Sequence, residues 1–197
     1  MLLQFIIKED TIEKIEQTAR AVMDAGVNWI EICAPDKVSD DELKALIDKL
    51  RPELADKGVV LIIGNRYEQA KEWQCDGVHI YDTAKPISAV RVALDAWPII
   101  GVSVKDEASA VALRPYDIDY LYYESAGTPE DYETLKDIAK YLDENTIETP
   151  LVAGGDITEG NILSHIDAGV AAIATSDLDT LGTLLHFAAN ETQKNIR

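Results

Sequence analysis

Short apolar segments alternate with longer amphipathic segments eight times along the chain, and this alternation constrains the fold more than any other feature. Each apolar segment has the length of a β-strand, and a pattern typical of an α-helix follows it. Strict alternation predicts a parallel sheet, and eight repeats favour a closed (β/α)8 TIM barrel over an open doubly wound sheet. Strands are expected at Leu2–Ile7, Val27–Cys33, Val59–Ile63, Gly77–Ile80, Ile99–Val104, Ile118–Tyr123, Leu151–Ala153 and Val170–Ala174.

The helix boundaries are predicted from capping residues and glycines. Asp10 is expected to cap the first helix, Ser39 opens a capping box with Glu42, and Thr128-Pro129 is a typical helix start. The tail after Asn190 is expected to fray. Helices are expected at Thr11–Ala25, from Ser39 to Lys57, Tyr67–Trp73, around Pro86, Glu107–Leu113, Thr128–Leu142, from Thr158 to Asp167, and Leu178–Asn190.

Length and composition bound the class of protein. With 197 residues, 47% of them hydrophobic, residues 1–197 are expected to form one globular domain, with 191–197 as a frayed tail. The formal net charge of −18 argues against nucleic acid and membrane surfaces as partners. Cys33 and Cys75 lie in or beside apolar runs, which suits reduced, buried thiols in a cytoplasmic protein. The first residues are expected to form a strand and not a signal peptide, and a homodimer is left open.

The stretch from Leu151 to Leu178 has the pattern of an anion-binding site. Gly154-Gly155 and Thr175-Ser176 each follow a strand and precede a predicted helix. Free backbone N–H groups and the positive end of a helix dipole meet at such places, and the loops after strands seven and eight form the common phosphate site of these barrels. The four residues are therefore candidates for holding the phosphate of a small metabolite, although they could instead be ordinary turns and caps.

Other candidate residues follow the carboxyl ends of the expected strands, where these barrels carry their active sites. Lys105 could act as a general base if burial lowers its pKa, and the alternative is a solvated loop lysine. Glu31 could be a general acid or base, or only a polar strand end. Arg66 could bind an anionic ligand. Among the remaining residues, Cys33 has no histidine placed to activate it, His79 is expected to make structural hydrogen bonds, and His165 and His186 are assigned no role.

Several short segments, in order, resemble the thiamine phosphate synthase family and its relatives, the thiazole tautomerases. The match runs over most of the chain from about Val59 onward, and it rests on Asn65-Arg66, Asp76–His79, Ile100–Ser103, Asp119-Tyr120, Ala153–Thr158 with Asn161, and Ala168-Gly169. On these residues the chain is identified as a divergent member of that superfamily. The resemblance implies that Asn65, Arg66 and Ser103 contribute to substrate binding and that Gly154-Gly155 bind a phosphate.

The chain departs from the family where the family's chemistry takes place. The synthase joins a pyrimidine diphosphate to a thiazole phosphate, and it releases pyrophosphate with magnesium present. Glu31–Pro35 stands in place of the family's Gln-x-Arg-x-Lys run, and Asn65 in place of a magnesium-binding aspartate. A second magnesium-binding aspartate of the family aligns near Ala84, and Asp82 is a displaced substitute for it. Mg²⁺ is therefore expected only if synthase activity is retained. Ser125–Asp131 replaces the family's Thr-x-Thr-Lys loop.

Three hypotheses follow. The first is a synthase-like barrel that binds a phosphorylated thiazole or pyrimidine, with ordinary synthase activity weak or absent because the cation and magnesium motifs are missing. The second is a tautomerase-like isomerase that uses Glu31 or Lys105, which stands where the tautomerases carry a histidine. The third is a barrel that has lost catalysis and binds a phosphorylated metabolite or only a protein partner.

Overall fold

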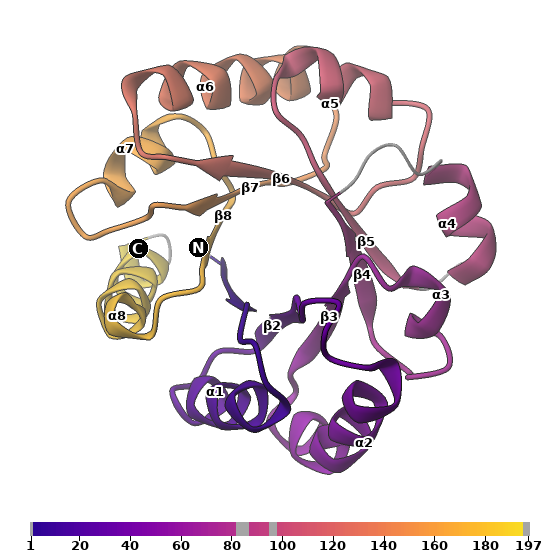
Figure 1. The fold of residues 1–197 in the computed structure, drawn as a ribbon. Coiled ribbons are helices and arrows are strands. Elements are labelled where there is room, and N and C mark those ends of the chain that lie inside the picture. The colour runs from indigo at the N-terminus through magenta and orange to yellow at the C-terminus, as the bar shows by residue number, and fades with distance from the viewer. Residues whose placement is uncertain (1, 82–86, 95–97, 195–197) are drawn as a thin grey trace. The chain divides into compact units, whose positions relative to one another are not determined.

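A closed barrel of strands in the order β1 to β8, with a helix after each strand, makes up the part of the chain that the computed structural model describes, residues 2–81, 87–94 and 98–194 (Figure 1). Side chains are described through residue 187. The strands pair in parallel, for example Glu31 of β2 with Ile62 of β3. The predicted (β/α)8 barrel is therefore confirmed.

The strands are β1 (Leu2–Ile7), β2 (Trp29–Ile32), β3 (Val60–Gly64), β4 (Gly77–Ile80), β5 (Ile99–Ser103), β6 (Tyr120–Ser125), β7 (Leu151–Gly155) and β8 (Ala172–Thr175). The helices are α1 (Ile12–Asp24), α2 (Asp40–Lys57), α3 (Tyr67–Ala70), α4 (Ile87–Leu94), α5 (Glu107–Leu113), α6 (Pro129–Glu144), α7 (Ile162–Asp167) and α8 (Leu178–Lys194).

Helix capping follows the prediction for Ser39 and Thr128 but not for Asp10. Ser39 and Thr128 cap α2 and α6, each in a complete capping box. The prediction for α1 is wrong, because the side chain of Thr11, not that of Asp10, accepts the backbone N–H of Lys14. Asp10 instead accepts hydrogen bonds from Lys37 and Lys14, which lower the pKa of its carboxyl to about 2.

Strands β6 and β7 extend further toward their carboxyl ends than predicted. Their ladder continues through Glu124 with Gly154 and Ser125 with Gly155, so the two glycines end a strand before the chain turns. Helix α7 begins at Ile162 and not after Thr158, because the side chain of Asn161 accepts the N–H of Thr158 and holds the intervening residues in a turn.

Three further expectations need correction or fall outside the described residues. Helix α8 runs to Lys194, beyond its predicted end at Asn190, while 195–197 are not described, and the fraying of the tail stays a prediction. The predicted helix start at Pro86 also lies outside the described residues. Both cysteines are free thiols, as expected. Each is half-buried, however, and not fully buried as predicted. None of the helices in the described residues is long and apolar enough to span a membrane.

Contacts within the chain group it into two units, Gln4–Ile100 and Gly101–Arg197 with Met1–Leu3, and each is considered by itself. That all residues form one domain stays a prediction. In the first unit Ile62 and Val78 of the strands are fully buried, and so are Leu43 and Ile47 of α2, as the apolar spacing of that helix predicts.

Candidate functional site

A buried carboxylate lies at the centre of the first unit. The side chain of Glu31 is completely buried and accepts three hydrogen bonds, from Gln4 Nε2 at 3.1 Å, His79 Nδ1 at 2.8 Å and the Tyr81 hydroxyl at 2.7 Å. Glu31 lies on β2 and His79 on β4, with β3 between them. A direct contact between side chains of such strands is possible only on the inner side of the barrel wall, so this cluster points inward.

Glu31 was a candidate from the sequence, whereas the residues around it were not grouped with it. His79 does make a hydrogen bond, as expected, but its partner is this candidate acid, and its ring stacks on Tyr81 with centroids 4.0 Å apart. Gln4, Glu31 and His79 are polar residues inside apolar strands, and a buried polar group needs a partner. That signal could have grouped them. The role of Glu31 as a general acid or base stays a prediction.

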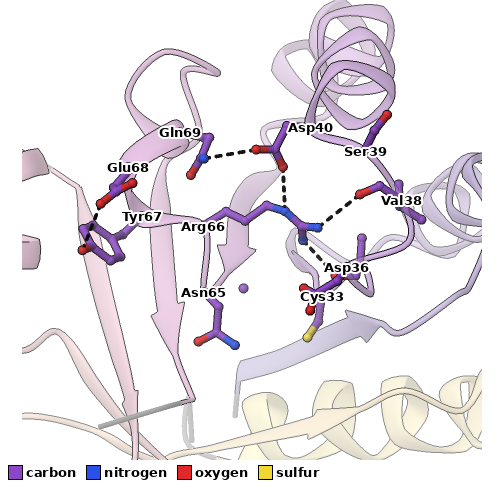
Figure 2. A pocket seen from close by; sticks show the side chains of 12 residues that line it. Cys33, Asp36, Val38, Ser39, Asp40, Asn65, Arg66, Tyr67, Glu68 and Gln69 are labelled. Carbon is purple, nitrogen blue, oxygen red and sulfur yellow. Dashed lines mark hydrogen bonds and ion pairs between the residues drawn. The ribbon is translucent and has the colours of Figure 1, made fainter. Parts of the chain in front are cut away.

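Next to this cluster, the loops after β2 and β3 enclose a hollow of about 500 Å³ (Figure 2). Three acidic side chains line it, Asp36, Asp40 and Glu68, together with the single cation Arg66. The complete lining is Cys33, Ala34, Asp36, Val38, Ser39, Asp40, Gly64, Asn65, Arg66, Tyr67, Glu68 and Gln69. With three carboxylates and one guanidinium, the hollow carries net negative charge.

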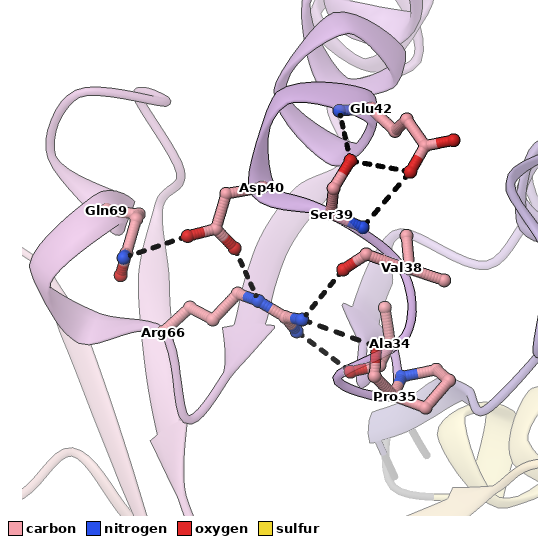
Figure 3. A network of polar contacts seen from close by, with 8 residues as sticks. All are labelled: Ala34, Pro35, Val38, Ser39, Asp40, Glu42, Arg66 and Gln69. Atoms are coloured by element: carbon pink, nitrogen blue, oxygen red, sulfur yellow. Dashed lines mark hydrogen bonds and ion pairs between the residues drawn. The ribbon is translucent and has the colours of Figure 1, made fainter.

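Arg66 is engaged within the chain (Figure 3). Its Nε donates to Asp40 Oδ1 at 3.0 Å, and its Nη1 donates to the carbonyl of Ala34 at 2.8 Å. Its Nη2 faces the carbonyls of Val38 and Pro35 at 3.3 and 3.4 Å. These contacts hold the loop after β2 against the loop after β3. An anion could bind this guanidinium only by competing with them, and the predicted ligand role of Arg66 stays a prediction.

Asn65 has a structural role at the end of β3. Its backbone adopts φ of 57°, a left-handed conformation that asparagine tolerates, and its side-chain oxygen accepts the backbone N–H of Tyr81 at 3.0 Å. The oxygen that replaces the family's magnesium-binding carboxylate is therefore neutral and already bonded. The described residues do not fit a magnesium site at this place, and they hold no metal-binding group of three or more His, Cys, Asp or Glu. Asp82 lies outside the described residues.

The thiol of Cys33 borders both the cluster and the hollow. Burial raises its pKa, and the nearby charge of Glu31 raises it further. A thiol with a raised pKa stays protonated near neutral pH and is a poor nucleophile.

In the second unit, the pairing of β7 with β8 brings the predicted phosphate-binding residues together. Gly154 and Gly155 end β7, and Thr175 and Ser176 end or follow its neighbour β8. Packing alone also requires the glycines. A Cβ on Gly154 would lie 2.1 Å from the Tyr122 hydroxyl oxygen, and one on Gly155 would lie 2.2 Å from the Ser125 carbonyl oxygen. Tyr122 therefore fills the space beside Gly154 that the sequence suggested for a ligand.

Several backbone donors of these two loops already have acceptors in the protein. The N–H groups of Asp156 and Thr158 donate to the Ser125 carbonyl and to the side chain of Asn161, at 2.8 Å each. Thr175 Oγ1 accepts the N–H of Asp177, whose own carboxylate accepts the N–H of Asp179 in the first turn of α8. The negative charge of Asp177 thus occupies the place where the helix dipole would favour an anion. Phosphate binding by these residues stays a prediction.

Two other candidates lie in the second unit. Lys105 follows β5 and is exposed, and its backbone N–H donates to Ser109 Oγ at the start of α5. Lys105 therefore lacks the burial on which its predicted role as a general base depends. Ser103 ends β5 and is half-buried. The roles predicted for Lys105 and Ser103 stay predictions.

His165 has a role that the sequence analysis did not assign. Its ring is completely buried, with Nδ1 3.0 Å from the Asn161 carbonyl oxygen and Nε2 2.9 Å from Ser125 Oγ. A carbonyl only accepts, so Nδ1 carries the hydrogen and the neutral ring accepts the Ser125 hydroxyl at Nε2. The ring also meets Tyr132 edge-on. His165 therefore joins α7 to the end of β6.

Because His165 is buried as a neutral ring, stability is expected to fall in mild acid. Burial lowers its pKa, while the Asn161 carbonyl and the charges of Asp131 and Asp156 oppose the shift. The unfolded chain binds the proton below the ordinary value of about 6.5, so the contribution is complete above that pH and is lost as pH falls toward the lower folded pKa. Urea unfolding at about pH 7.5 and about pH 5.5 should show a larger fall in midpoint for the wild type than for His165→Gln. Equal falls would contradict this account.

Comparisons with known proteins agree with the fold. The family profile described as thiamine monophosphate synthase matches residues 3–177. A thiamine-phosphate synthase of Bacteroides thetaiotaomicron is 28% identical over 203 residues, covering 98% of this chain and 94% of the relative. One of Chlorobium luteolum is 29% identical over 173 residues, covering 86% and 81%. The solved thiamine phosphate pyrophosphorylase from Pyrococcus furiosus superposes with a TM-score of 0.74 at 23% identity, covering 89% and 86%, which supports the fold alone.

Proposed function

The chain belongs to the thiamine monophosphate synthase family, and from that membership we propose that it binds a phosphorylated thiazole- or pyrimidine-type metabolite while forming little or no thiamine phosphate. The family places the chain among proteins of thiamine biosynthesis. The proposal separates the two halves of the family's task, which are to hold a phosphorylated substrate and to stabilise a departing pyrophosphate.

The observation that carries the proposal is the charge of the hollow after β2 and β3. A leaving pyrophosphate needs several cations or a metal aimed at it. Here the hollow has three acids, its one guanidinium is paired with Asp40, and Glu31 and Cys33 replace residues of the family's cationic run. A diphosphate brought to this hollow would meet net repulsion, which supports weak or absent synthase activity.

Support for phosphate binding comes from the loops after β7 and β8. The two strands are neighbours, Gly155 has φ of 92°, and α8 is a 17-residue helix whose amino end follows Thr175 and Ser176. The combination of a glycine turn and a helix amino end is the usual phosphate site of this fold. Asp177 opposes an anion there, so the expected affinity is modest.

Replacing the charge at α8 should therefore strengthen phosphate binding. Asp177→Asn keeps a good N-cap side chain and removes one negative charge from the helix amino end. A charge at that position is worth roughly 0.3–1 kcal/mol, so thiazole phosphate should bind about two- to five-fold more tightly to the variant. Isothermal titration calorimetry of thiazole phosphate measures this, at low ionic strength where the effect is largest.

The matched control is Asp143→Asn, in the last turn of α6, where the affinity should equal that of the wild type. If thiazole phosphate binds with the same affinity to Asp177→Asn, Asp143→Asn and the wild type, its phosphate binds elsewhere on the protein. Absence of binding to every variant, with inorganic phosphate also silent, would overturn the proposal and leave a barrel that binds only a protein partner.

One observation favours an isomerase as the second candidate. Glu31 is buried and bonded to a histidine and a tyrosine, an arrangement that suits proton transfer better than pyrophosphate release. Lys105, the other residue proposed for such a reaction, is exposed. The proposal for an isomerase therefore rests on Glu31.

A further inference from the structure

A continuous chain of hydrogen bonds runs from His79 through Glu31 to the hydroxyl of Tyr81. His79 Nδ1 contacts Glu31 Oε2 at 2.8 Å, and the Tyr81 hydroxyl donates to Glu31 Oε1 at 2.7 Å. His79 and Glu31 are fully buried, whereas Tyr81 is half-buried. The two oxygens of one carboxylate thus join a buried imidazole to a phenol that is in part accessible.

The accessible end of this chain adjoins the hollow after β2 and β3. Two residues of the hollow's lining, Cys33 and Asn65, contact Tyr81, the first through its thiol and the second through the Tyr81 backbone N–H. Gln4 Oε1 is a further polar atom of this cluster. It is buried on a fully buried side chain, its amide nitrogen contacts Glu31, and the described residues offer it no donor. The cluster therefore keeps one acceptor that a small ligand or a water molecule can use.

From these contacts we propose that Tyr81 is a catalytic acid–base residue, that Glu31 takes up its proton while His79 positions Glu31, and that the hollow holds an uncharged or cationic nitrogen heterocycle ring of the substrate. The lining's three carboxylates against one ion-paired guanidinium favour such a ligand over an anion. The stacking of Tyr81 on the buried His79 ring holds the phenol in place.

The proton transfer balances without any further reactant. A C–H or N–H bond of the heterocycle breaks and its electron pair stays on the ring. The proton passes to the Tyr81 oxygen while the hydroxyl proton of Tyr81 passes to Glu31 Oε1, so the negative charge moves from the carboxylate to the ring. The bond from His79 Nδ1 keeps Glu31 oriented between turnovers. Reversal, with a proton drawn from solvent, returns hydrogen to the same or another ring atom.

Deuterium exchange into 4-methylthiazole tests the relay. In D2O the wild type should speed loss of the ring C2 proton, followed by proton NMR, by about 10²-fold over buffer, the lower end of general acid–base catalysis. Tyr81→Phe keeps the ring and loses the hydroxyl, so exchange should fall to the buffer rate while circular dichroism shows a retained fold, because Gln4 and His79 still donate to Glu31. Tyr116→Phe, an exposed tyrosine of the second unit, is the matched control and should exchange at the wild-type rate.

The positioning residues have a separate readout. Glu31→Gln and His79→Gln should lower the exchange rate and flatten its pH profile, while 4-methylthiazole still binds to both variants. If they change only thermal stability, the pair is structural and the relay is overturned. Wild-type exchange no faster than buffer, or wild-type exchange in Tyr81→Phe, also overturns it, as does loss of exchange in Lys105→Ala with Tyr81→Phe unaffected.

This inference rests on the proposed function only for the choice of a thiazole ring as the probe. Because 4-methylthiazole carries no phosphate, the exchange experiment is independent of the loops after β7 and β8. Failure of phosphate binding in calorimetry and failure of proton exchange therefore identify which of the two proposals is wrong.

Discussion

Gly155→Ala is expected to destabilise the fold by about 4 kcal/mol, the sum of a strained backbone and an overpacked contact. Gly155 has φ of 92°, where an L side chain is strained whatever the space around it. An added Cβ would also lie 2.2 Å from the Ser125 carbonyl oxygen and 3.0 Å from the Ser125 nitrogen. Both are backbone atoms of β6, paired with Gly155 in the sheet, so they cannot turn aside as a side chain could.

Urea unfolding followed by circular dichroism measures this loss. Gly160→Ala is the matched control in the same loop, because its Cβ would meet only Thr158 Oγ1 at 3.8 Å and its φ is ordinary. We expect that variant to stay within about 1 kcal/mol of the wild type. Similar stabilities for the two variants would mean that the end of β7 is not packed against β6 as described.

The fold class could be predicted from the sequence because the signal is local and repeated. Strand–helix alternation and the capping residues Ser39 and Thr128 each depend on a few neighbouring side chains. The cap of α1 was predicted wrongly for a non-local reason. Asp10 and Thr11 are both good caps, and Lys37, 27 residues from Asp10, draws the aspartate away.

The site was less predictable because its contacts join distant parts of the chain. Glu31 meets residues 48 and 50 positions later, His79 and Tyr81, and nothing in the local pattern sets that distance. Arg66 is held by carbonyls of the loop after β2, and a backbone carbonyl has no signature in the sequence. Gly154 resembled part of a ligand site, but its small size also makes room for Tyr122, 32 residues earlier.

Synthase activity is expected to be at least about 10³-fold below that of the Bacteroides thetaiotaomicron relative under the same conditions. Removal of a single preorganised donor from a transition state costs about 10²–10³ in rate, and this hollow lacks more than one. Arg66 is paired with Asp40, Asn65 offers a neutral oxygen already bonded to Tyr81, and Glu31 adds a negative charge. Each of these would raise the energy of a separating pyrophosphate.

Phosphorus NMR of one sample tests this central claim most directly. The purified protein is incubated with the pyrimidine diphosphate, thiazole phosphate and magnesium, and the relative from Bacteroides thetaiotaomicron is the positive control. The expected spectrum shows a thiazole phosphate resonance broadened or shifted by binding, with no pyrophosphate or thiamine phosphate above background. Growth of those two product resonances at a rate near that of the control would contradict the account.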